Sequence, residues 1–196
     1  MLTTEMGRTK TNGELRSGFE VLTTCSPSNF DYVKSLGADV VFDYNSPTWT
    51  SDVRAHTDDK LYYIWDCIGT PASYATTPHA LSTSPPEGQE LRYGTIVTPP
   101  EGRNFGSEVK VTHTLGYSVS GEAFRLGSKE FPARQEDYDF MVEWYKIALE
   151  LLEQGKWKPH RLDVRDGGLE GIFEGLKDME EGRVSGVKVV YRIGEP

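Results

Sequence analysis

The alternation of strands and helices in this chain starts abruptly at Phe19, and the residues before it do not extend the pattern. Residues 19–24, F-E-V-L-T-T, look like a strand, and residues 25–30 form a turn that opens a helix. Residues 1–18 are polar, hold no comparable run and lack a G-x-G-x-x-G motif. We therefore expect an incomplete α/β sheet that lacks its first strand and the glycine-rich loop after it.

The rest of the chain alternates strands and helices with short connections. Ser26 is expected to cap a helix that has Pro27 at its first position and ends at Gly37. Further strands are expected at residues 40–44, 61–66, 91–98, 109–118 and 187–193, helices at 45–56, 71–82, 137–154 and 168–181, and loops at 84–89, 101–107 and 121–134. Such alternation favours right-handed crossovers and a doubly wound parallel sheet with a C-terminal helix-strand appendage.

Composition and charge argue against several classes of partner. The 196 residues, 37% hydrophobic and 26% charged, can bury one good-sized core. No apolar stretch reaches the ~18 residues of a membrane span, and residues 1–18 lack the apolar centre of a secretion signal. The net charge of −9 argues against nucleic acid or an anionic membrane as partner. Cys25 and Cys67 are expected to be reduced thiols of a cytoplasmic protein.

Five short motifs carry a family resemblance through their order and spacing. They are T-C-S-P-S-N-F-D at 24–31, S-L-G-A-D with V-F-D-Y at 35–44, D-C-I-G at 66–69, T-L-G-Y at 114–117 and G-R-V-S-G-V-K at 182–188. Together they resemble the medium-chain dehydrogenase/reductase family, in its zinc-free quinone-oxidoreductase and enoyl-reductase branch, and most of all the trans-acting enoyl reductases of fungal polyketide pathways. The resemblance covers about residues 18–193, which corresponds to the C-terminal half of a family member.

The resemblance implies a Rossmann-like fold in three parts. Residues 1–17 are a non-matching segment that can be disordered, residues 18–165 are a truncated nucleotide-binding domain, and residues 166–196 are a helix and strand that in relatives pack on a catalytic domain. Loss of the central strand would leave a gap of roughly 10 Å between its neighbours. That gap must close or be filled. Residues 1–16, with Gly7, Gly13 and several charges, are a poor candidate to fill it.

The resemblance also implies an NADPH site at the carboxyl ends of the strands. An acidic residue after the second strand binds the ribose of NAD, whereas this chain has Cys25 and Ser26 there, before a helix N-terminus. The Ser26 hydroxyl and the Asn29 amide would suit a 2′-phosphate, although a plain helix cap is the alternative. Other positions implied for the cofactor are Cys67, Gly69, Thr98, Leu115 and Tyr117. Each has an alternative role in a strand end, a turn or the core.

Two residues are candidates for acid–base chemistry. Asp66 ends a strand beside the inferred cleft, where a carboxyl group could have a raised pKa, and His113 lies in a strand near the same cleft. Capping of the next turn is the alternative for Asp66, and a structural role is the alternative for His113. Cys25 is either a thiol of lowered pKa or a small buried hydrophobe. The histidines and cysteines lack the spacing of zinc ligands. Aromatic residues that could line an apolar cleft are Trp49, Tyr62, Tyr63, Trp65, Tyr117 and Phe124.

The sequence favours a secondary-metabolite biosynthetic protein derived from an NADPH-dependent enoyl reductase. The favoured hypothesis is that it has lost hydride transfer, requires no cofactor, and acts on a polyketide-like intermediate as a cyclase or isomerase. The first alternative is an NADPH-dependent enoyl reductase that works with a partner chain or as an oligomer, and the second is a non-catalytic binding module. The C-terminal apolar residues need a cover, for which a homo-oligomer or a partner protein is expected; they are Leu169, Ile172, Phe173, Val189, Val190 and Tyr191.

Overall fold

The computed structural model describes residues 2–6 and 19–194. Its strands are β1 (Leu2–Met6), β2 (Glu20–Cys25), β3 (Val40–Asp43), β4 (Tyr63–Asp66), β5 (Leu91–Thr95), β6 (Val109–His113), β7 (Phe124–Leu126), β8 (Lys129–Phe131), β9 (Leu162–Arg165) and β10 (Lys188–Tyr191). Its α-helices are α1 (Phe30–Ser35), α2 (Trp49–His56), α3 (Pro71–Thr76), α4 (Gln135–Glu153) and α5 (Gly168–Glu180), and its 3₁₀ turns are η1 (Pro27–Asn29), η2 (Thr77–Ala80) and η3 (Gly116–Ser120).

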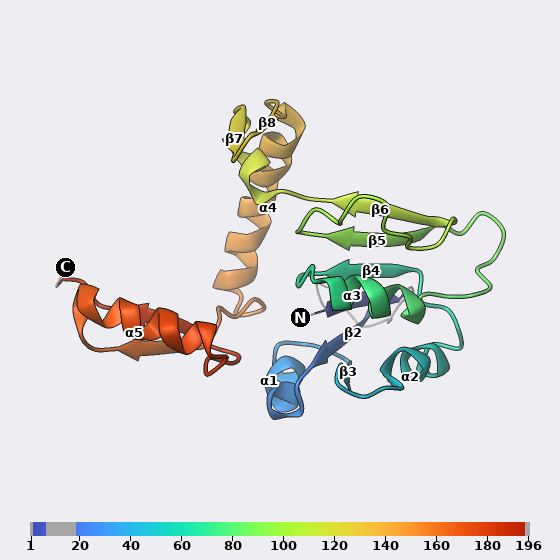
Figure 1. Ribbon diagram of the computed structural model, residues 1–196, viewed down its shortest axis with the longest axis horizontal. Helices are drawn as coiled ribbons and strands as arrows, with labels where there is room; N and C mark the ends of the chain where they lie inside the picture. Colours follow the sequence, from blue (N-terminus) through green and yellow to red (C-terminus); the bar gives the residue numbers. More distant parts are fainter. Residues whose placement is uncertain (1, 7–18, 195–196) are drawn as a thin grey trace.

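The main sheet has six strands in the order β3-β2-β1-β4-β5-β6 (Figure 1). The β2–β3, β4–β5 and β5–β6 pairs are parallel, which confirms the predicted parallel α/β architecture. β1 lies at the centre and pairs antiparallel with both β2 and β4. The prediction that residues 1–16 would not fill this place is therefore wrong. The strand is short enough to end before Gly7, and an antiparallel neighbour needs no crossover helix. Residues 7–17 lie outside the described part.

The core lies between this sheet and the short helices packed on it. Its largest fully buried side chains include Tyr74 from α3 and Tyr93 from β5, and Phe105 packs against both rings. Close packing extends into the sheet, because a Cβ built on Gly94 would lie 2.3 Å from the Trp65 ring. The other members of the core cluster are Leu22, Trp49, Val53, Leu61, Ile64, Ala80, Leu81 and Leu91.

Four local predictions differ from the structure near the turns. The helix expected from Ser26 is divided into η1 and α1, and the Ser26 side chain makes no capping hydrogen bond. The strand expected at 109–118 ends at His113, and η3 follows. The loop expected at 121–134 contains the β7–β8 hairpin, because Gly127 adopts a positive φ of 58° at the turn and Phe124 stacks on Phe131 at 4.9 Å. No strand was expected where β9 lies.

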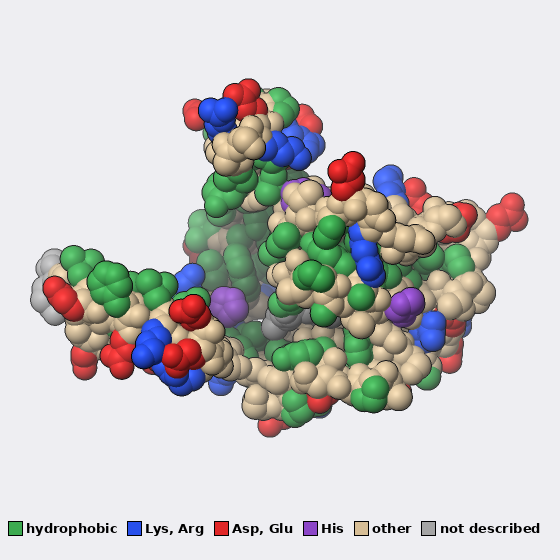
Figure 2. All heavy atoms as spheres, in the orientation of Figure 1, with side chains coloured by type: hydrophobic (Ala, Val, Ile, Leu, Met, Phe, Trp, Pro, Cys, Tyr) green, Lys and Arg blue, Asp and Glu red, His purple; other side chains and the backbone are tan. Residues whose placement is uncertain are grey.

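The C-terminal residues form a separate unit beside the main sheet. β9 and β10 pair in parallel with α5 between them in the sequence, and Figure 1 shows this unit joined to the sheet through the long helix α4. β9 falls within 18–165, so the unit begins before the boundary expected at residue 166. Figure 2 shows apolar side chains along α4 and α5 around a hollow beside the main body. Across the described residues, no helix is both long and apolar enough to cross a membrane.

Candidate functional site

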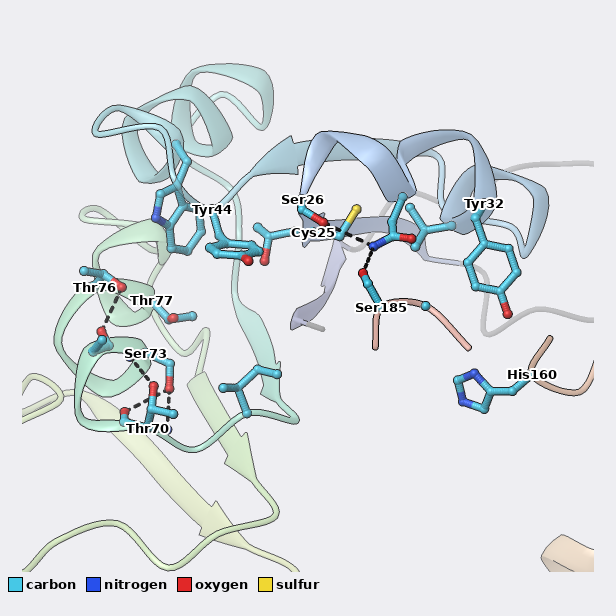
Figure 3. A pocket seen from close by; sticks show the side chains of 17 residues that line it. Cys25, Ser26, Tyr32, Tyr44, Thr70, Ser73, Thr76, Thr77, His160 and Ser185 are labelled. Atoms are coloured by element: carbon cyan, nitrogen blue, oxygen red, sulfur yellow. Dashed lines mark hydrogen bonds between the residues drawn. The ribbon is translucent and has the colours of Figure 1, made fainter. Parts of the chain in front are cut away.

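A cavity of about 640 Å³ lies at the carboxyl ends of β2 and β4, on either side of β1 (Figure 3). Its volume falls in the range of small-molecule and cofactor sites, and the carboxyl edge of an open α/β sheet is where such proteins bind ligands. Its walls come from four places: the β2–α1 segment, the β3–α2 segment, the β4–α3 turn with α3 and η2, and two C-terminal loops, one before β9 and one between α5 and β10. The lining residues also include the aromatic side chains Tyr32, Tyr44 and Trp49.

The β2–α1 wall carries a small network of neutral polar groups. The Asn29 amide nitrogen donates to Ser26 Oγ at 3.2 Å and to Ser185 Oγ at 2.9 Å. The sequence predicted Ser26 and Asn29 as cofactor residues, and the structure brings both to the cavity. Ser185 was not predicted, because it lies 156 residues from Asn29 in the chain. No carboxylate is among the described residues that line the cavity, so the acidic group typical of NAD sites does not face it.

The C-terminal unit lines this side of the cavity with Ser185 and Gly186, and Arg161 contacts Gly186 and Tyr32. The Arg161 guanidinium lies over the Tyr32 ring at 3.7 Å and donates to the Gly186 carbonyl oxygen at 3.3–3.4 Å. Gly186 has a positive φ of 64°, and a Cβ there would lie 2.5 Å from Asn29 Oδ1. Glycine is therefore required at this contact. His160, beside Arg161, presents its imidazole to the cavity from the same loop (Figure 3).

The opposite wall is built on the turn after β4. Thr70 and Ser73 form a reciprocal capping box at the start of α3, with Pro71 at the first helical position. Ile68, Thr70 and Ser73 line the cavity, and Thr76 and Thr77 follow them on the same wall (Figure 3). The Thr77 side chain is fully buried.

Asp66 is a structural anchor beneath this wall. Its carboxylate is fully buried and accepts hydrogen bonds from the Ile68 and Gly69 N–H groups at 2.8 and 3.1 Å, from Ser73 Oγ at 2.7 Å and from the Tyr93 hydroxyl at 2.6 Å. Burial raises the pKa of this carboxyl group, but the four hydrogen bonds outweigh burial and lower it. The expected raised pKa is therefore wrong, and Asp66 does not line the cavity.

The other predicted positions lie outside the cavity lining. Thr98 and His113 come together at the ends of β5 and β6, with Thr98 Oγ1 and His113 Nε2 3.4 Å apart. Tyr117 is 63% exposed and contacts Phe124, and Leu115 precedes η3. Gly69 was predicted to let a cofactor approach the backbone closely. The groups that lie close to it are instead the Val97 and Tyr74 side chains, which a Cβ at this position would meet.

The two cysteines differ in their relation to the cavity. Both are free thiols. Cys25 is buried and lines the cavity, and burial raises its pKa, which contradicts the hypothesis of an activated thiol there. Burial also raises the pKa of Cys67, which is not among the lining residues. Of the aromatic residues predicted for a cleft, Trp49 lines this cavity and the other five do not. Within residues 2–6 and 19–194, no three His, Cys, Asp or Glu residues are grouped as metal ligands.

Comparisons with known proteins agree with this architecture. The model of the zinc-binding dehydrogenase family matches residues 16–132. A trans-enoyl reductase of Alternaria alternata, ACTTS2, is 40% identical over 178 residues, which are 90% of this chain and 49% of that protein. A trans-enoyl reductase of Gibberella fujikuroi is 36% identical over 179 residues, again 90% and 49% of the two chains.

Solved structures show the same fold. The crystal structure of the JamJ enoyl reductase in its apo form superposes with a TM-score of 0.62 at 16% identity, covering 88% of this chain and 46% of that one. The chain spans about half the length of the curated relatives named above. Because the family model matches more than half of its residues, the chain belongs to the zinc-binding dehydrogenase family, as a medium-chain dehydrogenase/reductase related to the fungal trans-enoyl reductases.

Proposed function

We propose that this protein is an enoyl-reductase-type protein of secondary metabolism whose cavity binds the adenosine 2′-phosphate end of NADPH. The observation that carries the proposal is the Ser26–Asn29–Ser185 network at the end of β2, in a cavity whose described lining holds no carboxylate. The Ser26 and Ser185 hydroxyls accept from the Asn29 amide and can therefore donate to a phosphate, whereas a carboxylate at this place would repel it.

The residues present fit the adenosine end of this cofactor. Tyr44 and Trp49 supply apolar ring faces, and Ile68 and Ala72 supply an aliphatic wall on the other side. Ser26, Asn29 and Ser185 supply polar groups at the β2 end. When bound, NADPH supplies a hydride for reduction of an activated carbon–carbon double bond. The chain itself contributes binding, orientation and exclusion of water at the sheet edge.

The proposal is tested by calorimetric titration with NADPH and NADH. Asn29→Asp places a negative charge beside the proposed 2′-phosphate, so we expect NADPH binding to weaken by about tenfold or more while NADH binding changes little. Asn104→Asp is the matched control: it makes the same change in an exposed loop, where a carboxylate can still accept the Gly106 N–H bond that Asn104 Oδ1 accepts at 2.8 Å. Equal affinity of the unmodified protein for NADPH and NADH, or no binding of either, would refute the proposal.

A cofactor-independent cyclase or isomerase is the second candidate function. The aromatic lining formed by Tyr32, Tyr44 and Trp49 favours it, because such a cavity can hold a polyketide-like chain by shape. In this function the acid–base residue would be His160, whose imidazole faces the cavity, instead of the predicted Asp66 and His113. Conversion of a polyene thioester without NADPH, abolished in His160→Ala, would support this function. Identical conversion with and without protein would exclude it for that substrate.

A further inference from the structure

The segment that leads from α4 into the C-terminal unit concentrates positive charge in an acidic protein. Residues 155–161 read G-K-W-K-P-H-R and contain no acid, although the whole chain has a net charge of −9. Lys158 and Arg161 form no ion pair with any described carboxylate. Uncompensated cations beside a cavity raise the local concentration of anionic ligands there.

Arg161 is held against two residues that line the cavity, Tyr32 and Gly186. Its guanidinium lies over the Tyr32 ring, its backbone N–H donates to the Tyr32 hydroxyl at 3.3 Å, and its side chain donates to the Gly186 carbonyl oxygen. A Cβ built on Gly186 would lie 2.5 Å from Asn29 Oδ1 and 3.0 Å from Arg161 Nη2. The guanidinium and the Asn29 amide therefore flank the same glycine, and the cation sits next to the polar network.

The direction of β1 takes its carboxyl end away from the cavity. β1 runs antiparallel, so its last residue, Met6, pairs with Glu20 at the amino end of β2, away from the cavity. A parallel central strand would end at the cavity edge and deliver its following turn there. In this chain the described groups at that edge come from the β2–α1 segment, the β3–α2 segment, the β4–α3 turn with α3 and η2, and the C-terminal loops.

We propose that Arg161 is the cationic half of a phosphate site whose neutral half is Ser26, Asn29 and Ser185. The ligand group is a phosphomonoester on the ribose of an adenosine. The guanidinium offers several N–H donors in one plane, which suits phosphate oxygens, and the Ser26 and Ser185 hydroxyls, held by the Asn29 amide, complete the set. The inference rests on the proposed function and extends it, because it makes the C-terminal unit a determinant of ligand choice.

Two sources could supply such a phosphomonoester, and fragment ligands separate them. Adenosine 2′,5′-bisphosphate represents NADPH, adenosine 3′,5′-bisphosphate represents a coenzyme A thioester, and adenosine 5′-monophosphate lacks the second phosphate. Calorimetric titration of the whole chain should show at least about tenfold tighter binding of one bisphosphate than of the monophosphate. Preference for either bisphosphate supports the site, and the preferred isomer identifies the source.

Substitution at Arg161 tests the contribution of the C-terminal segment. Arg161→Ala should remove the preference for the bisphosphate and leave monophosphate binding within about twofold, whereas Arg161→Lys should retain part of the preference. Arg125→Ala, on the exposed β7–β8 hairpin, is the matched control. Because Arg161 also contacts Tyr32, the thermal midpoints of the variants must stay close to that of the unmodified chain.

The outcomes separate the two proposals. Equal binding of monophosphate and bisphosphates by the unmodified chain would overturn the phosphate site. Full preference retained in Arg161→Ala would overturn the role of the C-terminal segment while the proposed function stands. Absence of NADPH binding together with tight binding of a 3′-phosphate would overturn the proposed function and support the phosphate site.

Discussion

Replacing Asp66 by Asn should destabilise the fold strongly, because the carboxylate organises four hydrogen bonds in a fully buried place. Oδ1 accepts the two backbone N–H bonds, and Oδ2 accepts from the Ser73 and Tyr93 hydroxyls at 2.7 and 2.6 Å. An Asn side chain can keep the first pair but turns an NH₂ group toward the two hydroxyls. Loss of two charge-assisted bonds at about 1.5–3 kcal/mol each predicts a decrease of about 3 kcal/mol or more in the free energy of unfolding.

Urea unfolding followed by tryptophan fluorescence measures this change. Asp52→Asn is the matched control, because Asp52 lies exposed on α2 and accepts a bond from Thr48 Oγ1; its effect should stay within about 0.5 kcal/mol. Since the folded-state pKa of Asp66 is lowered, its contribution is present above the unfolded-state value of about 3.9 and is lost as the pH falls through the folded-state pKa. The difference in unfolding free energy between the unmodified chain and Asp66→Asn should therefore shrink below about pH 4. A decrease under 1 kcal/mol at pH 7 would refute the anchoring role of Asp66.

Three further predictions concern stability and assembly. Burial and the hydrogen bond to Asp66 raise the pKa of Tyr93. Its contribution to the free energy of unfolding is therefore complete below the unfolded-state pKa of about 10 and is lost as the pH rises above that value. Tyr93→Phe should weaken this alkaline loss of stability in urea titrations at pH 8 to 11. Gly94→Ala should lower the unfolding free energy by about 1–3 kcal/mol, because the new Cβ would meet the Trp65 ring at 2.3 Å; an unchanged urea midpoint would contradict that packing. Homo-oligomerisation through the apolar faces of α4 and α5 predicts a sedimentation coefficient above that of a monomer, and Phe173→Glu, at a side chain that is 76% exposed, should reduce it; a monomer at all concentrations would exclude this assembly.

The sequence predicted the parts of the site that depend on neighbours in the chain. Ser26 and Asn29 follow directly after a recognisable buried strand, so their place at the carboxyl edge of the sheet could be inferred from local pattern alone. For the turn after β4 the sequence indicated the right segment but the wrong residues, because Cys67 and Gly69 were predicted and their neighbours Ile68 and Thr70 line the cavity. The structure places Ser26 and Asn29 at the cavity, with Ile68 and Thr70 opposite them.

The parts that could not be predicted depend on distant contacts. Ser185 and Gly186 reach the cavity, and Arg161 reaches Tyr32, from more than 100 residues farther along the chain, and nothing in their own segments shows which surface they meet. The pKa of Asp66 depends on Tyr93, 27 residues away in the chain. The position of a carboxylate at a strand end therefore does not reveal whether its pKa is raised or lowered. β1 was missed because the glycines and charges of residues 7–16 mask a five-residue strand that ends before them.

The central place of β1 governs how the sheet can come apart. On one side of it lie β2 and β3, on the other β4, β5 and β6, and in the described sheet the two groups share hydrogen bonds through β1 alone. When β1 detaches, β2 and β4 both become open edges whose backbone groups seek another strand. In concentrated solution, β1 of a second copy can pair with these open edges. Exchange of β1 between two chains would then give domain-swapped dimers. Protein handled at high concentration or after heating should therefore be checked for slowly dissociating dimers before any ligand titration.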